Sequence, residues 1–171
     1  EEDNCVSKTV AVLNKHFDDD ICREAASRML QALVKPTHVS NAVVDIKQVL
    51  PHYTNESEDR IGQRLLDSLN VLSALASNES LFKTYEKNEV HAVIKDVLKT
   101  TCRLDDAPFL EGVVAACSRV LHSIVEADNQ KTKMLNSGVV KSVVQNMKVH
   151  PKLDASIAAG LKFIALLSSD E

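Results

Sequence analysis

The chain has 171 residues with a net charge of −4, 4% aromatic residues, no Trp, and only four Gly and four Pro. Few Gly and Pro beside abundant Ala, Leu, Val and Lys favour helices over strands, and the length is that of one domain with its own core. The acidic balance gives no support for binding to nucleic acid or an anionic membrane, and no apolar run approaches the roughly 20 residues of a membrane span.

The start of the chain and its cysteines bear on its cellular setting. The sequence begins with Glu1 and has neither an apolar signal segment nor a transit-peptide composition, so we expect a single domain over 1–171 that is a fragment of a longer protein. The cysteines never form a C-x-x-C pair, which predicts reduced thiols and a cytoplasmic location, with the nucleus as an alternative. They are Cys5, Cys22, Cys102 and Cys117.

Apolar residues recur at spacings of three and four along most of the chain, which predicts amphipathic helices. The first half is expected to form helices over 4–17, 18–35, 38–53 and 61–76. The second half is expected to form helices over 80–85 and 90–98, one that follows Pro108 and runs to about Val125, and three more between 127 and 167. The polar stretch 54–59 predicts a loop or a cap.

Two aspartate-rich stretches are expected to begin helices. Asp18 to Asp20 would accept hydrogen bonds from free backbone N–H groups and meet the positive end of the helix dipole. A metal site is the alternative for three aspartates, but the glycine and the distal glutamate of a calcium loop are missing. Asp105 and Asp106 precede Pro108, which predicts a cap followed by proline in the first turn of the next helix.

A nine-residue pattern recurs four times without gaps, at intervals of 42, 49 and 43 residues. Its first position is small, its fourth and fifth are apolar, and its eighth is Leu or Ile. This pattern predicts one buried helix face with a close helix–helix approach at the small residue. The windows are 26–34 (ASRMLQALV), 68–76 (SLNVLSALA), 117–125 (CSRVLHSIV) and 160–168 (GLKFIALLS).

A second pattern supports a repeat of about 45 residues. Asn88 and Gly138 both tolerate the left-handed backbone conformation, and each stands just before a Val-rich helical pattern. We therefore expect a left-handed residue at both positions, with the helices aligned as 90–94 and 140–144.

The closing segment resembles an armadillo repeat. Asn129 and Gln130 open a short first helix, Asn136-Ser137-Gly138 precede a second, and the window 160–168 lies in a third. The resemblance implies an all-α fold in which three-helix repeats stack into a right-handed α-solenoid, with the third helices lining a concave groove. The related HEAT repeat has two helices, and the short helix over 80–85 favours three. The approximate repeats are 4–36, 37–77, 78–126 and 127–169.

The chain departs from the best-known members of that family, importin alpha and beta-catenin, which hold extended peptides with a ladder of Trp and Asn. The Trp column corresponds to the third window position and the Asn column to the seventh. Here the third position holds Arg28, Asn70, Arg119 and Lys162, and the seventh holds Ala32, Ala74, Ser123 and Leu166. The ladder is absent, so recognition of nuclear signals by that mechanism is not expected.

The groove side that the resemblance implies is polar and carries three cations. Arg binds carboxylates bidentately and Lys supplies a point charge, so the matching ligand is an acidic or mixed peptide, or an acidic partner surface. The alternative is an ordinary solvated helix face without a ligand. The candidate partner-binding residues are Arg28, Gln31, Asn70, Ser73, Arg119, His122 and Lys162.

Motifs for catalysis and cofactor binding are absent from the sequence. There is no P-loop, no G-x-S-x-G, no H-E-x-x-H and no Rossmann glycine pattern. His122 lies five residues after Cys117, which is a poor spacing for two zinc ligands on one helix face. We therefore expect no catalytic residues, no cofactor and no metal, and a protein that is not an enzyme.

These observations predict a non-catalytic protein-interaction scaffold or adaptor that presents a concave groove to an extended, acidic peptide or partner surface. One alternative is a regulatory module that binds a small GTPase or another switch protein through edges and loops such as 54–59, as armadillo-like domains in formins and GTPase chaperones do. A structural spacer between domains is another. Leu161, Phe163 and Leu166 are more apolar than a solubilising end cap, which predicts self-association through the C-terminal repeat or coverage by a further repeat.

Overall fold

The computed structural model describes residues 2–15, 33–76, 78–128 and 131–169, together with residues 25 and 29. The chain is all-α over these residues, with no strand, which confirms the all-α part of the predicted fold class. The α-helices are α1 (Glu2–Lys15), α3 (Pro36–Val49), α4 (Asp59–Leu75), α5 (Phe82–Lys87), α6 (Val90–Thr101), α7 (Leu110–Asp128), α8 (Lys131–Ser137), α9 (Val139–Val149) and α10 (Asp154–Ser168), with short 3-10 turns at Leu50–His52 and Glu79–Leu81. None of the described helices is both long enough and apolar enough to cross a lipid bilayer.

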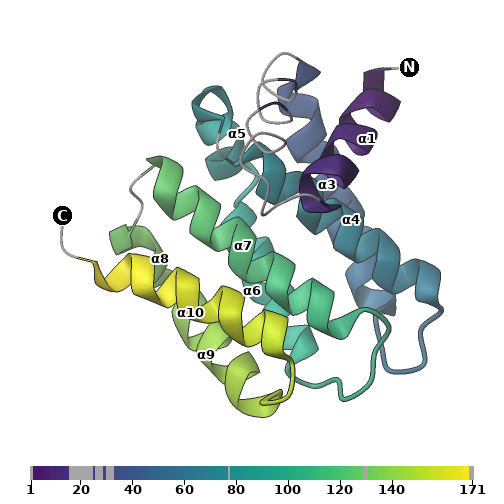
Figure 1. Cartoon of the computed structure of the whole chain (residues 1–171), viewed down its shortest axis with the longest axis vertical. Coiled ribbons are helices and arrows are strands. Elements are labelled where there is room, and N and C mark those ends of the chain that lie inside the picture. The colour runs from purple at the N-terminus through teal and green to yellow at the C-terminus, as the bar shows by residue number, and fades with distance from the viewer. Residues whose placement is uncertain are drawn as a thin grey trace.

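The helices form two layers around a common core. In the first layer α7 lies between α4 and α10 and packs against both. The second layer contains α3, α6 and α9, where α3 packs on α4, α6 packs on α7, and α9 packs on α10 (Figure 1). The short helices α5 and α8 precede α6 and α9, and α1 packs against α4.

The central helix α7 is apolar on most sides because neighbours surround it. Val113, Val114, Ala116, Val120 and Leu121 are all buried. Cys117 is a buried free thiol, and loss of hydration raises its pKa above the ordinary value. The predicted burial of the small first residue of the window 117–125 is therefore confirmed, and the side chain of Cys117 is held in the unreactive thiol form.

The buried face predicted by the nine-residue windows is confirmed for the third window and largely for the second. In the last window Phe163 is buried, whereas Ile164 and Leu167 are only partly buried. The small residues Ser68, Cys117 and Gly160 are buried. The prediction is wrong at Met29, whose side chain is 53% exposed. Periodicity places an apolar residue on a helix face, but burial also needs a neighbouring element to cover that face. Ala26 and Leu30 lie outside the described residues.

The predicted left-handed residue before each of α6 and α9 is present, but before α6 it lies one position later than predicted. Gly138 caps α9 with a φ of 79°, as predicted. Asn88 has a φ of −88°, and the left-handed residue before α6 is Glu89, with a φ of 49°. A non-glycine residue can adopt this conformation at an energetic cost, so the sequence pattern did not reveal it. α6 and α9 therefore align as Val90 with Val139, a spacing of 49 residues that equals the spacing of the windows in α4 and α7.

The segment before α7 forms a turn and not the predicted helix start, because side chains from another part of the chain bind it. α7 begins at Leu110, and Phe109 has a φ of 60°. The Tyr53 hydroxyl donates to the carbonyl oxygen of Pro108 at 2.8 Å. Asn55 Oδ1 accepts from the backbone N–H groups of Asp105 and Asp106 at 3.0 and 3.2 Å. The stretch 54–59 was predicted as a loop or cap, and its Asn55 holds the loop before α7 in place. The local sequence of that second loop had predicted the start of a helix.

Candidate functional site

The third window positions bring Asn70 of α4 and Arg119 of α7 into contact. Arg119 Nη2 donates to Asn70 Oδ1 at 3.3 Å, across 49 residues of sequence. Both side chains are partly buried, because each projects from its helix beside the seam where α4 and α7 pack together. Two of the predicted partner-binding residues therefore form one unit, which we call the Asn70–Arg119 pair.

The guanidinium of Arg119 is partly buried. Among the described residues, no carboxylate forms an ion pair with it. Burial lowers the pKa of Arg119 from its ordinary value, and the nearby Cys117 acts in the opposite direction. Arg offers five N–H donors in a planar fork, and Asn70 uses one of them. The remaining donors can receive a carboxylate, and the bond to Asn70 limits the orientations of the fork.

The next turn of α7 adds a titratable pair. His122 Nδ1 lies 3.6 Å from Glu126 Oε2, at an i, i+4 spacing on the same helix face. Sequence reasoning included His122 in the site and missed Glu126, although this spacing could have identified it. Glu126 places a negative charge beside the predicted cationic column, so the site is mixed in charge.

The other predicted site residues are distributed differently. Ser73 of α4 is partly buried, and Lys162 of α10 is exposed. Lys162 continues the column on the third helix of the layer but has no hydrogen bond or ion pair with the Asn70–Arg119 pair. Arg28 and Gln31 lie outside the described residues. The structure thus brings together two of the seven candidates, puts His122 beside Glu126, and leaves Lys162 open to solvent.

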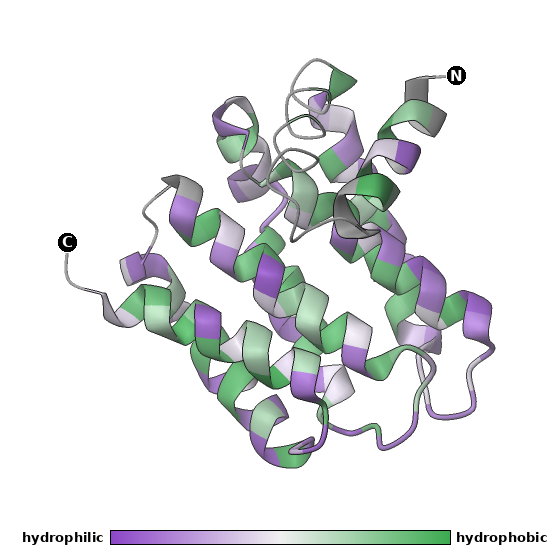
Figure 2. Cartoon of the chain, in the orientation of Figure 1, coloured by the Kyte–Doolittle hydropathy of each residue, from purple (hydrophilic) through white to green (hydrophobic). Residues whose placement is uncertain are grey.

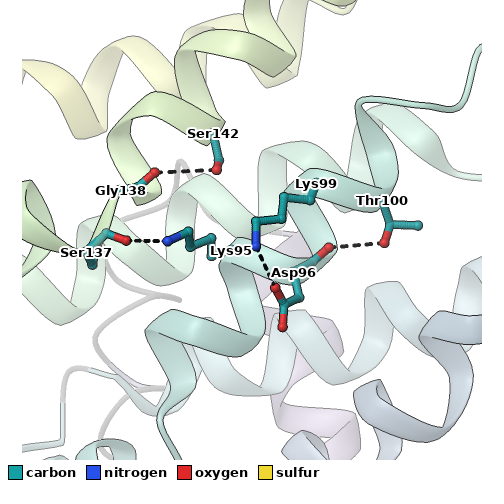
Figure 3. A network of polar contacts seen from close by, with 7 residues as sticks. All are labelled: Lys95, Asp96, Lys99, Thr100, Ser137, Gly138 and Ser142. Carbon is teal, nitrogen blue, oxygen red and sulfur yellow. Dashed lines mark hydrogen bonds and ion pairs between the residues drawn. The ribbon is translucent and has the colours of Figure 1, made fainter.

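Polar contacts in the second layer join helices and cap their ends. Lys95 Nζ donates to the carbonyl oxygen of Ser137 at 2.6 Å, and so satisfies an acceptor at the C-terminal end of α8 (Figure 3). Lys99 pairs with Asp96 at 3.2 Å within α6, on an exposed surface (Figure 3). The network contains backbone acceptors and one exposed ion pair, which is the composition of helix capping and not of a catalytic centre.

A small hollow lies where α5, α6, α7 and α8 meet. Lys133 Nζ and Glu86 Oε1 pair across it at 3.0 Å, and His91 lines it. The pKa of His91 is lowered chiefly by burial and secondarily by the charge of Lys133. Tyr85 also lines the hollow, and burial raises the pKa of its hydroxyl while that hydroxyl donates to the carbonyl oxygen of Leu72. The tyrosine is therefore neutral and occupied by a structural hydrogen bond.

Within the described part of the chain, no three His, Cys, Asp or Glu side chains gather as a metal site. Asp18, Asp19 and Asp20 lie outside that part. Comparison with protein-family models, with curated proteins and with solved structures found no match for the chain.

Proposed function

We propose that the chain is an armadillo-type α-solenoid that acts as a non-catalytic interaction scaffold, with an acidic or mixed peptide bound along α4, α7 and α10. The repeat interpretation is supported by the sequence distance between residues that form hydrogen bonds with each other. Arg119 and Asn70 are 49 residues apart, His150 and Thr101 are 49 apart, and Asn146 and Leu98 are 48 apart. Contacts at about one repeat length are expected when each unit packs only against its neighbours.

The arrangement of helices also supports this proposal. The proposed repeats 37–77, 78–126 and 127–169 contain α3 with α4, α5 to α7, and α8 to α10. Their last helices lie side by side in the first layer. An extended partner laid across that layer would meet one helix of each repeat in turn, which is how stacked repeats present long binding surfaces.

The observation that carries the binding site is the Asn70–Arg119 pair. A guanidinium that is partly desolvated and has no carboxylate partner gains more from an incoming anion than a fully hydrated one. A carboxylate of the partner would supply the missing counter-charge, and Asn70 would hold the fork in place. Lys162 would contribute an exposed second charge, which adds little affinity alone but favours encounter with an acidic segment.

Selection from a displayed random-peptide library tests this proposal without assuming a partner. We expect the selected peptides to be enriched in Asp and Glu. Their affinity should fall by about 30-fold or more in Arg119→Glu, since losing one partner of a desolvated charge pair costs about 2–5 kcal/mol.

Arg103→Glu is the matched control. Arg103 is exposed and lies just after α6, so this substitution makes the same charge change outside α4, α7 and α10. This variant should bind the peptides as the wild type does. Circular dichroism of both variants would show whether helicity is retained. Selected peptides without acidic enrichment, or peptides that bind Arg119→Glu and Arg103→Glu equally well, would exclude the groove.

A regulatory module for a small GTPase or another switch protein is the second candidate, and one observation favours it. Phe109 is 43% exposed on the edge that Tyr53 and Asn55 hold in place. An exposed aromatic side chain on a fixed loop is a suitable anchor for a protein partner. This function would require that the chain binds the GDP and GTP forms of a GTPase with different affinities, and that Phe109→Ala abolishes this binding. Peptide binding at Arg119 would be unaffected by the same substitution.

A further inference from the structure

The outer side of the α9–α10 pair combines apolar side chains with lysines. We call this surface the end face and define it by Val144, Ile157 and Leu161 with Lys141 and Lys148. Its residues are exposed or partly exposed on α9 and α10, and it is separate from the Asn70–Arg119 pair, which joins α4 and α7. Occupation of the end face therefore does not require the proposed groove.

Close packing of α9 and α10 sets the geometry of the end face. A Cβ atom on Gly160 would lie 2.9 Å from Met147 Sδ and 3.2 Å from Val143 Cγ1, so glycine allows the two helices to approach. Val144 is one position further round α9 than Val143. Ile157 and Leu161 are four residues apart, and therefore share one side of α10.

The apolar part of the end face is open. Leu161 is 54% exposed. Val144 and Ile157 are partly exposed and do not belong to the hydrophobic core, unlike their neighbours Val143 and Phe163. Most residues of α10 are apolar (Figure 2), and Asp154 and Lys162 are its only charged residues, whereas a helix that borders solvent ordinarily carries a polar stripe there. An exposed apolar surface with a polar rim is typical of a protein-interaction site.

Charge indicates what kind of partner would cover this surface. Residues 131–169 contain six Lys and one Asp, a net charge of +5 in a chain whose total is −4. Lys141 and Lys148 are exposed, and neither forms an ion pair with a described residue. Two copies paired through this face by two-fold symmetry would bring lysines against lysines, which is unfavourable. The complementary partner is acidic.

We propose that the end face binds an acidic amphipathic α-helix of a protein partner. Apolar side chains along one face of that helix would cover Val144, Ile157 and Leu161, and its carboxylates would meet Lys141 and Lys148. Such a helix carries its apolar anchors at i, i+3, i+4 and i+7, which is the established geometry of helix recognition by an apolar surface.

A pair of stapled model helices provides the probe. One carries leucines along one face and glutamates elsewhere, and the other replaces every glutamate by lysine. We expect the glutamate helix to bind, with amide NMR shifts confined to α9 and α10, and the lysine helix not to bind. Lys141→Glu combined with Lys148→Glu should weaken binding by about tenfold, and Leu161→Ser by about tenfold or more.

The controls separate this site from general charge effects and from the groove. Lys47→Glu combined with Lys87→Glu makes the same charge change on exposed residues of α3 and α5, and should leave the affinity unchanged. Arg119→Glu should also leave it unchanged, so failure of one site would not be mistaken for failure of the other. Thermal unfolding of each variant would verify folding, which substitution of exposed residues should preserve.

Three results would overturn the proposal. Equal binding of the lysine helix would remove the charge argument. Shifts confined to α4 and α7 would place the probe elsewhere. Sedimentation showing a dimer of the free chain that Leu161→Ser dissociates would identify a second copy, not an acidic helix, as the occupant.

Discussion

Gly62 marks a close approach between the backbone of α4 and the backbone of the loop before α7. A Cβ atom at this position would lie 2.3 Å from the carbonyl oxygen of Pro108. The loop before α7 therefore rests directly on the first turns of α4, and Tyr53 fixes the same carbonyl by a hydrogen bond. The sequence shows a glycine inside a helical pattern, but its reason lies in a loop 46 residues further along the chain.

Gly62→Ala should destabilise the protein by about 1–3 kcal/mol, because a backbone carbonyl cannot move aside without shifting the loop. Gly112→Ala is the control. Its Cβ would meet only the Leu66 side chain at 3.1 Å, and alanine gains about 1 kcal/mol of helix propensity over glycine. Urea unfolding of both variants measures the difference. Equal stabilities would contradict the close approach at Pro108.

His91 couples stability to pH. Its pKa in the folded protein lies below the ordinary value of 6.5, chiefly because of burial and then because of Lys133. The unfolded chain therefore binds more protons than the folded chain as the pH falls through and below 6.5, so stability decreases on acidification through this window. His91→Gln should reduce the slope of the unfolding free energy against pH between the folded-state pKa and 6.5. An unchanged slope would show that His91 titrates normally in the folded state.

At the scale of elements, α6 and α9 are joined by a buried polar cluster. The Thr101 hydroxyl donates to Asn146 Oδ1 at 2.8 Å, and Asn146 Nδ2 donates to the carbonyl oxygen of Leu98 at 2.8 Å. His150 Nε2 lies 3.0 Å from the carbonyl oxygen of Thr101. Because buried polar groups must be hydrogen-bonded, this cluster admits few alternative alignments of the two helices.

Asn146→Ala should cost about 1–3 kcal/mol, since it leaves buried partners on α6 without a hydrogen bond. Asn136→Ala, at an exposed position of α8, should change stability by less than about 0.5 kcal/mol. Chemical denaturation of both variants provides the test. A loss no larger for Asn146 than for Asn136 would mean that the cluster is not important for joining the helices.

The helices themselves were largely predictable from the sequence, whereas the turns that connect them were not. Apolar spacing predicted α4, α6 and the helices of the closing segment because each has one face against the core. The same spacing could not show that α7 begins at Leu110, because Tyr53 and Asn55 impose the preceding turn from a distance. It also could not show that Glu89 adopts the left-handed conformation usually given to glycine.

For the site, the sequence predicted that Asn70 and Arg119 share one column, and the structure puts them in contact. It did not predict partial burial of Arg119 or the presence of Glu126, since both depend on how α4 and α7 pack. Lys162 remains a prediction for the site, because its exposure alone does not distinguish a binding residue from a solvated one. Self-association through the C-terminal repeat also remains a prediction. Of the residues on which it was based, Leu161 is exposed, but Phe163 is buried because it packs into the core, so the prediction was wrong in counting Phe163 as surface.

At the scale of the whole molecule, the proposed solenoid links these features. Several hydrogen bonds and an ion pair between distant segments connect residues about one repeat apart, and the last helices of the proposed repeats 37–77, 78–126 and 127–169 lie in the same layer (Figure 1). A ligand that runs across α4, α7 and α10 would contact Asn70, Arg119 and Lys162 in order. The end face on α9 and α10 would remain available to a second partner.

Paramagnetic relaxation with a library-selected acidic peptide tests the central claim most directly. With a spin label on the bound peptide, we predict broadening of amide signals around Asn70, Arg119 and Lys162, and loss of that broadening in Arg119→Glu. Broadening confined to the loops 54–59 and 103–109, or identical spectra for the wild type and Arg119→Glu, would contradict a scaffold that binds peptides along the α4, α7 and α10 layer.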